Sequence, residues 1–227
     1  MLQVLLSLIL IAGASAQPCN ALPSVSFVPG VQPAPPILPN VFQGFVTVTS
    51  LTNESSSVLF NGRIYVDYPS SQERYDYSFV GGVASAVYHF ATAQVPTGSI
   101  SVVGAMGSEP ICQGVSFSEP MSSPTVFSDA KFVGFSQVPE AGLCTVWKKS
   151  LFGQTATLFV KANPTPFGSI PVLFVTPVSI YHFEGVVTDI PDGIFSLPPN
   201  ACSSNASSSS SPRIRELLKH FGPMWSV

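Results

Sequence analysis

Short apolar runs rich in Val, Phe, Tyr, Ile and Thr recur along the chain, separated by Pro, Gly, Ser and Asn. Runs of this length, with turn residues about every dozen positions, predict β-strands of an antiparallel sheet. The 22 prolines agree, because proline forms turns and is excluded from helix interiors. We expect strands at residues 42–50, 57–68, 74–80, 83–90, 99–103, 111–117, 130–137, 144–151, 155–161, 170–175 and 179–187.

The stretch 62–79, GRIYVDYPSSQERYDYSF, predicts a hairpin whose alternation fixes the two faces. A four-residue turn at 69–72 places Asp67 opposite Arg74, a cross-strand ion pair worth about 0.2–1 kcal/mol. Glu73 then lies at the turn. The apolar side chains fall on one face, because a one-residue slip would exchange the faces; they are Ile64, Val66, Tyr75, Tyr77 and Phe79.

The dipeptide Asn61-Gly62 lies inside the run 57–68 and can be interpreted in two ways. Asn-Gly between alternating runs is a strong signal for a tight hairpin turn. That hairpin would leave a first strand of only three or four residues. The alternative is a glycine bulge within one long strand, and the sequence leaves both open.

Residues 1–16 have the pattern of a signal peptide, an apolar run at 2–11 followed by Ala14, Ser15 and Ala16. We expect cleavage before Gln17 and a secreted, extracellular protein. The apolar run is too short for a membrane anchor, and no second run of spanning length follows. The sequence therefore predicts no transmembrane segment.

The remainder divides by composition into four segments. Residues 17–41 are proline-rich and expected to be extended, 42–202 form the β domain, and 203–211 are a serine-rich linker. Residues 212–227 are either disordered or a short amphipathic helix with Ile214, Leu217 and Leu218 on one face. The acidic residues outnumber the basic ones from 17 to 202, which argues against a nucleic-acid partner.

The chain has four cysteines, Cys19, Cys112, Cys144 and Cys202. An even number in an exported protein predicts two disulfides, and the spacing alone allows three pairings. No nucleophile motif is present: the histidines (His89, His182, His220) are scattered, and there is no Gly-x-Ser-x-Gly. We therefore expect a protein that is not an enzyme and carries no cofactor.

Two sequons fit export, at Asn53 in a polar turn and at Asn205 in the serine-rich linker. Each lies where a glycan would not disturb a core. The sequence predicts a glycoprotein modified at these two asparagines.

Four stretches resemble the ependymin-related branch of the LolA-like lipoprotein-carrier fold. They are GRIYVDYPSSQERYDYSF, VYHF, ICQGVSF and SIYHFEGVVTDIPDGIFSLPPNAC, in that order along the chain. The resemblance implies one curved antiparallel sheet, a LolA-like half-barrel, or two stacked sheets. It also implies that Cys112 pairs with Cys202, which leaves Cys19 for Cys144.

The resemblance further implies a deep apolar pocket for a lipid or fatty-acid-like ligand. The strands supply these candidate lining residues: Ile64, Val66, Tyr75, Tyr77, Phe79, Tyr88, Phe90, Phe132, Phe159 and Phe174. Apolar side chains in these numbers are equally compatible with a filled core. The functional hypotheses are accordingly a carrier of hydrophobic ligands and, as the alternative, an extracellular structural or adhesive glycoprotein.

Relatives in that family are associated with calcium, for which Asp189 and Asp192 are the candidates here, with Glu184 just before them. Two carboxylates are too few for a cation that takes six to eight oxygens, so we interpret Pro-Asp-Gly as a turn. His89 and His182 fall in matching contexts on strands but are interpreted as packing or surface residues. The oligomeric state is left open, with a homodimer as one option.

Overall fold

The computed structural model describes residues 25–26, 30, 32–51, 58–151 and 153–197. The predicted signal peptide, serine-rich linker and C-terminal tail lie outside these residues. So do Cys19, Cys202, Asn53 and Asn205, whose predicted roles stay predictions.

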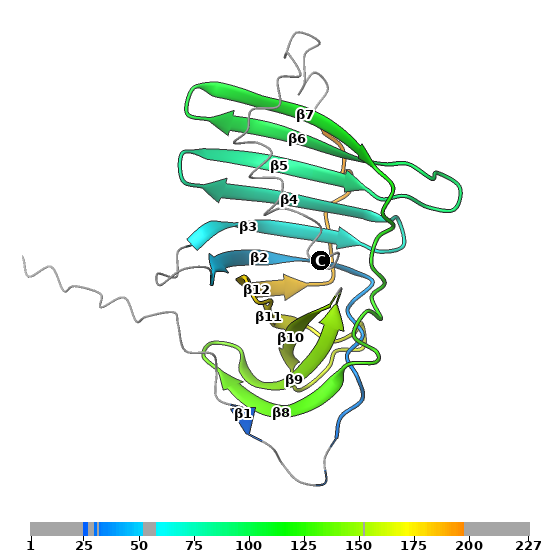
Figure 1. Cartoon of the computed structure of the whole chain (residues 1–227), viewed down its shortest axis with the longest axis vertical. Helices are drawn as coiled ribbons and strands as arrows, with labels where there is room; N and C mark the ends of the chain where they lie inside the picture. Colours follow the sequence, from blue (N-terminus) through cyan, green and yellow to red (C-terminus); the bar gives the residue numbers. More distant parts are fainter. Residues whose placement is uncertain (1–24, 27–29, 31, 52–57, 152, 198–227) are drawn as a thin grey trace, which may run out of the picture.

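Twelve strands form one antiparallel sheet (Figure 1). They are β1 (Val25–Ser26), β2 (Val41–Ser50), β3 (Val58–Asp67), β4 (Gln72–Phe79), β5 (Gly82–His89), β6 (Gly98–Met106), β7 (Glu109–Phe117), β8 (Lys131–Val138), β9 (Gly142–Leu151), β10 (Gln154–Lys161), β11 (Pro171–Val175) and β12 (Ser179–Val187). All eleven strands expected from the sequence are confirmed, with bounds that differ by a few residues. The sequence missed β1, which is two residues long.

The mainly β, antiparallel fold class is confirmed, and the structure has one unclosed sheet rather than two stacked sheets. The described residues contain no helix, and hence none that is long and apolar enough to cross a membrane. β8 and β9 bend strongly at one end of the sheet (Figure 1).

The sheet consists of two meanders joined at their first and last strands. β2 to β7 follow one another in space as in sequence, and so do β8 to β12. The chain returns from β7 to the far end of the sheet, begins β8 there, and comes back until β12 pairs with β2. The pairing of β12 with β2 therefore unites the two halves in one sheet.

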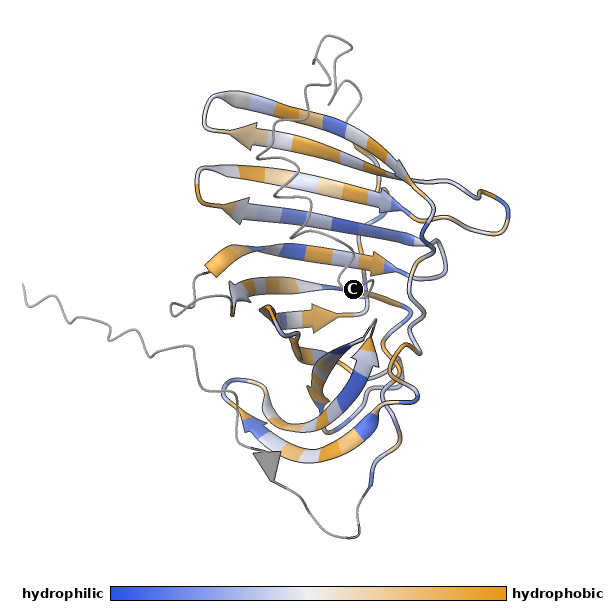
Figure 2. Ribbon diagram, viewed as in Figure 1, coloured by the Kyte–Doolittle hydropathy of each residue, from blue (hydrophilic) through white to orange (hydrophobic). Residues whose placement is uncertain are grey.

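One face of the sheet, here called the inner face, carries the main core. Hydrophobic and hydrophilic bands alternate along the strands (Figure 2), because successive side chains point to opposite faces. Cross-strand pairs keep the inner-facing positions aligned, as in Val46 with Phe183 and Leu158 with Trp147. The resulting buried cluster extends from Phe132 on β8 to Ile111 on β7.

A second, smaller core lies on the outer face, over β8 to β11. It is formed by Val138, Cys144, Val146, Phe159, Val172, Leu173 and Val175. β11 is consequently buried at all five positions. This double burial explains why β10 and β11 read as apolar on both faces in the sequence.

The hairpin of β3 and β4 has the predicted faces but not the predicted register. Asp67 pairs with Gln72, and Arg74 lies opposite Tyr65, so the predicted Asp67–Arg74 ion pair is wrong. The loop is 68–71 rather than 69–72, which moves the pairing by two residues and keeps each side chain on its face. Asp67 Oδ1 instead accepts a hydrogen bond of 3.0 Å from the Ser70 amide.

Gly62 lies within one continuous strand, so Asn61-Gly62 is not a hairpin turn. Its pairs, Val46 on β2 and Tyr77 on β4, continue both ladders without a bulge at this position. The irregularity in the β2–β3 ladder occurs at Val48 instead. A Cβ at Gly62 would lie 2.6 Å from Tyr77 Cα, which makes glycine the residue that fits between these strands.

The segment between β7 and β8 closes the inner face at the bent end of the sheet. Phe127 is fully buried, with its ring 6.0 Å from that of Phe174. Lys149 Nζ donates to Val126 O and to Asp129 Oδ1, both at 2.6 Å. Leu38 N donates to Pro124 O at 2.9 Å, which ties the segment before β2 to the same loop.

We predict that Phe127→Ala lowers the free energy of unfolding by about 3–5 kcal/mol, because it leaves a cavity at the center of this contact. Phe167→Ala is the matched control: that side chain is 68% exposed, against 0% for Phe127, and its loss should cost much less. Urea denaturation of both variants measures the difference. Equal losses would show that Phe127 does not fill the core.

The cysteines need one correction. Cys144 is a free, buried thiol in the outer core, so the predicted bond between Cys19 and Cys144 is not formed in the structure. The physical reason is its place on β9 among Val146 and Phe159, where burial raises the pKa of the thiol to about 11. The pairing of Cys112 with Cys202 stays a prediction.

The course of the chain after β12 bears on that pairing. Gln43 Nε2 donates to Asp189 O, and Arg74 Nη1 donates to Ile194 O, both at 2.6 Å. Gln43 and Arg74 point to the outer face, so residues 188–197 cross it from β12 towards β7, in orange in Figure 1. Cys112 pairs with Val103 at an outer-facing position of β7, on the side where this segment runs.

A free thiol at Cys144 makes a direct prediction. Iodoacetamide should leave Cys144 unmodified in the native protein and alkylate it once the unreduced protein is unfolded in guanidinium, because only unfolding exposes the sulfur. Peptide mass spectrometry locates the label. Recovery of Cys144 in a disulfide-linked peptide would contradict the structure.

Candidate functional site

The structure places nine of the ten predicted pocket residues on the inner face of the sheet. Phe159 is the exception and lies in the outer core, because the inner-facing positions of β10 are even-numbered. The nine divide between two groups of strands. Ile64, Val66, Tyr75, Tyr77, Phe79, Tyr88 and Phe90 belong to β3 to β5 or the residue after β5, and Phe132 and Phe174 to β8 and β11.

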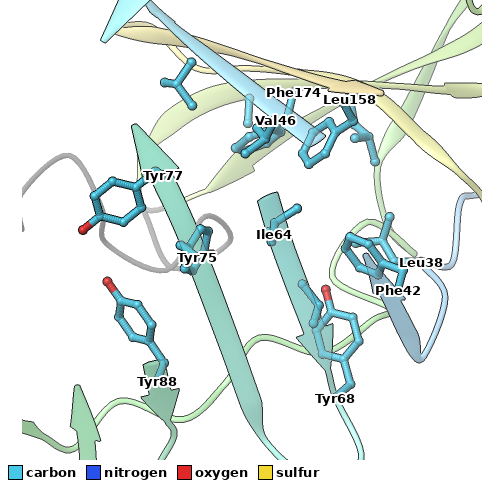
Figure 3. Packing of buried hydrophobic residues seen from close by; sticks show 14 of the residues in the cluster. Leu38, Phe42, Val46, Ile64, Tyr68, Tyr75, Tyr77, Tyr88, Leu158 and Phe174 are labelled. Atoms are coloured by element: carbon cyan, nitrogen blue, oxygen red, sulfur yellow. The ribbon is translucent and has the colours of Figure 1, made fainter. Parts of the chain in front are cut away.

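The first group forms a series of contacting rings. Tyr75 and Tyr88 meet edge to face at 5.6 Å between centroids, and Tyr88 stacks on Phe90 at 5.9 Å. Phe90 in turn meets Phe117 of β7 at 5.6 Å. The tyrosines of β4 and β5 extend from the sheet on the same side (Figure 3).

Glu73 lies inside this aromatic group, and the sequence did not predict its position. It occupies an inner-facing position of β4, between Val66 on β3 and Tyr88 on β5, and is 1% exposed. Tyr75 Oη donates a hydrogen bond of 2.7 Å to Glu73 Oε2. The shift of register by two residues brought this carboxyl from the expected turn into the core.

Burial controls the protonation of Glu73. Removal from water raises the pKa of the carboxyl from 4.5 to about 7, and the hydrogen bond from Tyr75 opposes this rise. Burial also raises the pKa of Tyr88 and of Tyr68, with a further contribution from the negative charge of Glu73. Glu73 therefore exchanges its proton near neutral pH, while the tyrosines around it stay neutral.

Two buried polar atoms of the inner face have no hydrogen-bond partner in the described part of the chain. One is the hydroxyl of Tyr68, a side chain that is 9% exposed, and the other is Oε1 of Gln113. Tyr68 follows β3, and its hydroxyl points towards the core beside Ile64 in Figure 3. A buried polar atom without a partner is destabilising, typically by about 1–3 kcal/mol.

The positive charges of these strands lie on the opposite, outer face. Arg74 Nε is 2.8 Å from Asp76 Oδ1, and the Arg63 guanidinium lies 4.5 Å from the centroid of the Phe45 ring. The inner-facing residues of β3, β4 and β5 include no basic side chain. Glu73 is thus the one ionisable carboxyl of that surface and has no cation facing it among these strands.

The inner-facing side chains of the predicted pocket are largely buried against one another. A small void of about 10 Å³ lies beside Phe174. A larger cleft of about 280 Å³ opens between Lys161, His182 and Glu184, on the outer face. The predicted pocket residues therefore form a packed aromatic surface in this structure.

The calcium and histidine candidates do not form a metal site. Among the described residues no group of three or more His, Cys, Asp or Glu could hold a metal ion. Asp189 and Asp192 belong to the segment on the outer face, where Ser196 N donates to Gly193 O in a turn. His89 and His182 lie on β5 and β12, with three strands between them, or about 19 Å at the usual strand spacing.

No protein-family model and no curated protein matches this chain. The resemblance to the ependymin-related family therefore stays a prediction.

The raised pKa of Glu73 predicts a loss of stability as pH rises. The folded state binds the Glu73 proton more tightly than the unfolded state does. Protonation therefore stabilises the folded state fully below about pH 4.5, and this stabilisation is lost above pH 7. The change is about 3 kcal/mol. The variant Glu73→Gln should lack it, since an amide keeps the shape without titrating.

Urea denaturation at pH 5, 6, 7 and 8 tests this, with the exposed Glu140→Gln as the matched control. Glu140→Gln should follow the unaltered protein at every pH. If the free energies of unfolding of Glu73→Gln and the unaltered protein changed with pH in the same way, that result would contradict a buried, titrating carboxyl.

Proposed function

We propose that this chain is a secreted, non-enzymatic protein that binds a hydrophobic, lipid-like ligand against the inner face of its sheet. The supporting observation is the combination on β3 to β5 of contacting aromatic rings with a buried carboxyl and a buried hydroxyl. Apolar surfaces with a few convergent polar groups are typical of ligand sites. Structural cores more often exclude such groups.

The fold is consistent with this proposal. One unclosed antiparallel sheet with a bent end agrees with the LolA-like half-barrel that the sequence resemblance implies. The course of residues 188–197 over the outer face agrees with a bond between Cys112 and Cys202. Secretion and glycosylation at Asn53 and Asn205 complete the proposal on sequence grounds.

A second candidate, an extracellular structural or adhesive glycoprotein with a filled core, also has an observation in its favor. The side chains of the inner face are largely buried, and the void beside Phe174 measures only about 10 Å³. In that protein the aromatic rings would serve stability alone.

Extraction of bound lipid separates the two candidates. The full chain, secreted from eukaryotic cells and purified without detergent, is extracted with organic solvent and the extract is examined by mass spectrometry. A ligand-binding protein should yield one class of amphiphile at a near-constant molar ratio to protein. Extracts that match a mock purification would favor the filled core.

Two variants on β5 locate the binding face. Ala84→Phe adds a ring on the inner face, and Ser85→Phe adds the same ring to the outer face of the next residue. Binding of the neutral apolar probe N-phenyl-1-naphthylamine should weaken at least tenfold in Ala84→Phe and be unchanged in Ser85→Phe. Melting curves check that both variants are folded; the reverse order of effects would place the ligand on the outer face.

A further inference from the structure

We propose that the inner face selects amphiphiles with a neutral hydroxyl at the polar end, in effect long-chain alcohols, and that Glu73 and Tyr68 bind this hydroxyl. The inference rests on the proposed function and specifies its ligand class. It is carried by the two polar groups that the aromatic surface of β3 to β5 encloses.

The first step concerns the hydrogen bonds still available. Glu73 Oε2 accepts from the Tyr75 hydroxyl, and the carboxyl has a second oxygen with its own lone pairs. Tyr68 lies two residues after Val66, the cross-strand partner of Glu73, and its buried hydroxyl has no partner among the described residues. An alcohol both donates and accepts, so one ligand oxygen can donate to the Glu73 carboxylate and accept from Tyr68.

The second step concerns the side chains that face Glu73 from each neighboring strand. Val66 lies opposite it on β3, Tyr88 opposite it on β5, and Tyr75 two residues along β4. Tyr68 follows Val66 by two residues in the same inner core, and both burial and the charge of Glu73 raise its pKa. Each of these groups is neutral at physiological pH.

This environment discriminates against a fatty-acid anion. A ligand carboxylate would add a second negative charge beside Glu73 in a medium of low dielectric constant, where like charges repel strongly. The arginines of these strands face outward, and Arg74 is engaged by Asp76, so no cation of β3 to β5 offsets that repulsion.

It also disfavors a long-chain amine. An ammonium group would have to leave water, and a buried ion pair repays that desolvation only in part. The tyrosine rings contact one another edge to face and do not form an open cage for a cation. A hydroxyl has the smallest desolvation cost of the three head groups and meets both available partners.

The test is displacement of N-phenyl-1-naphthylamine from the full chain at pH 8 by dodecan-1-ol, dodecanoic acid and dodecylamine, each kept below the concentration at which it separates from solution or forms micelles. We expect the alcohol to displace the probe at a concentration at least tenfold lower than the acid or the amine. At pH 5 the gap between alcohol and acid should narrow, because Glu73 is then largely protonated and no longer repels the ionised fraction of dodecanoic acid.

Variants connect the preference to the two residues. Tyr68→Phe should weaken the binding of dodecan-1-ol about fivefold and leave the binding of dodecanoic acid unchanged, as expected for one lost hydrogen bond. Tyr65→Phe, on the outer face of β3, is the matched control and should change neither. Glu73→Gln should raise the affinity for dodecanoic acid at pH 8 until it is close to the affinity for the alcohol, because the substitution removes the opposing charge.

Three results would overturn the inference: equal displacement by alcohol and acid at pH 8, tighter binding of the amine, or no effect of Tyr68→Phe on the alcohol. Each leaves the proposed function intact, since a ligand is still bound. A probe that does not bind, together with an extract free of lipid, would reject the proposed function and this inference together.

Discussion

The constraint on which the fold depends is that eleven consecutive pairings must keep the same set of side chains on one face. In an antiparallel sheet a slip of one residue exchanges the two faces. Here each strand pairing from β8 through β12 and from β2 to β7 places inner-facing residues opposite inner-facing residues. The register shifts at only four places, one in each of four pairings. This alignment produces one continuous core although the sheet never closes on itself.

The same constraint explains why the polar groups of the inner face are unusual. A shift of two residues preserves the faces, so the β3–β4 hairpin could take Glu73 from the turn into the ladder without exposing any apolar side chain. The protein thereby keeps a carboxyl among aromatic rings, held by the Tyr75 hydroxyl, at a cost that grows as pH rises through about 7. Carboxyls with raised pKa values occur often at functional sites, which supports the binding role proposed for this surface.

The strands were predictable because their apolar runs and turn residues act locally. Alternation also assigned Ile64, Val66, Tyr75 and Tyr77 to one face correctly. Phe159 was assigned to the wrong face because β10 is apolar on both faces. The alternation of apolar and polar residues therefore does not distinguish the two faces of this strand. Glu73 was missed because the four-residue loop begins one residue earlier than predicted, at Tyr68. Ser71 adopts a positive φ of 54° in this loop, a conformation that a non-glycine residue does not signal in the sequence.

The central claim is that an amphiphile binds to the inner face with its polar end at Glu73. Photo-crosslinking tests it most directly, using a long-chain alcohol that carries a diazirine next to its hydroxyl, with the modified residues located by tandem mass spectrometry. The account predicts labels at inner-facing residues of 66–90, centered on Glu73, Tyr75 and Tyr88. Labels confined to the outer-face cleft at Lys161, His182 and Glu184 would contradict it.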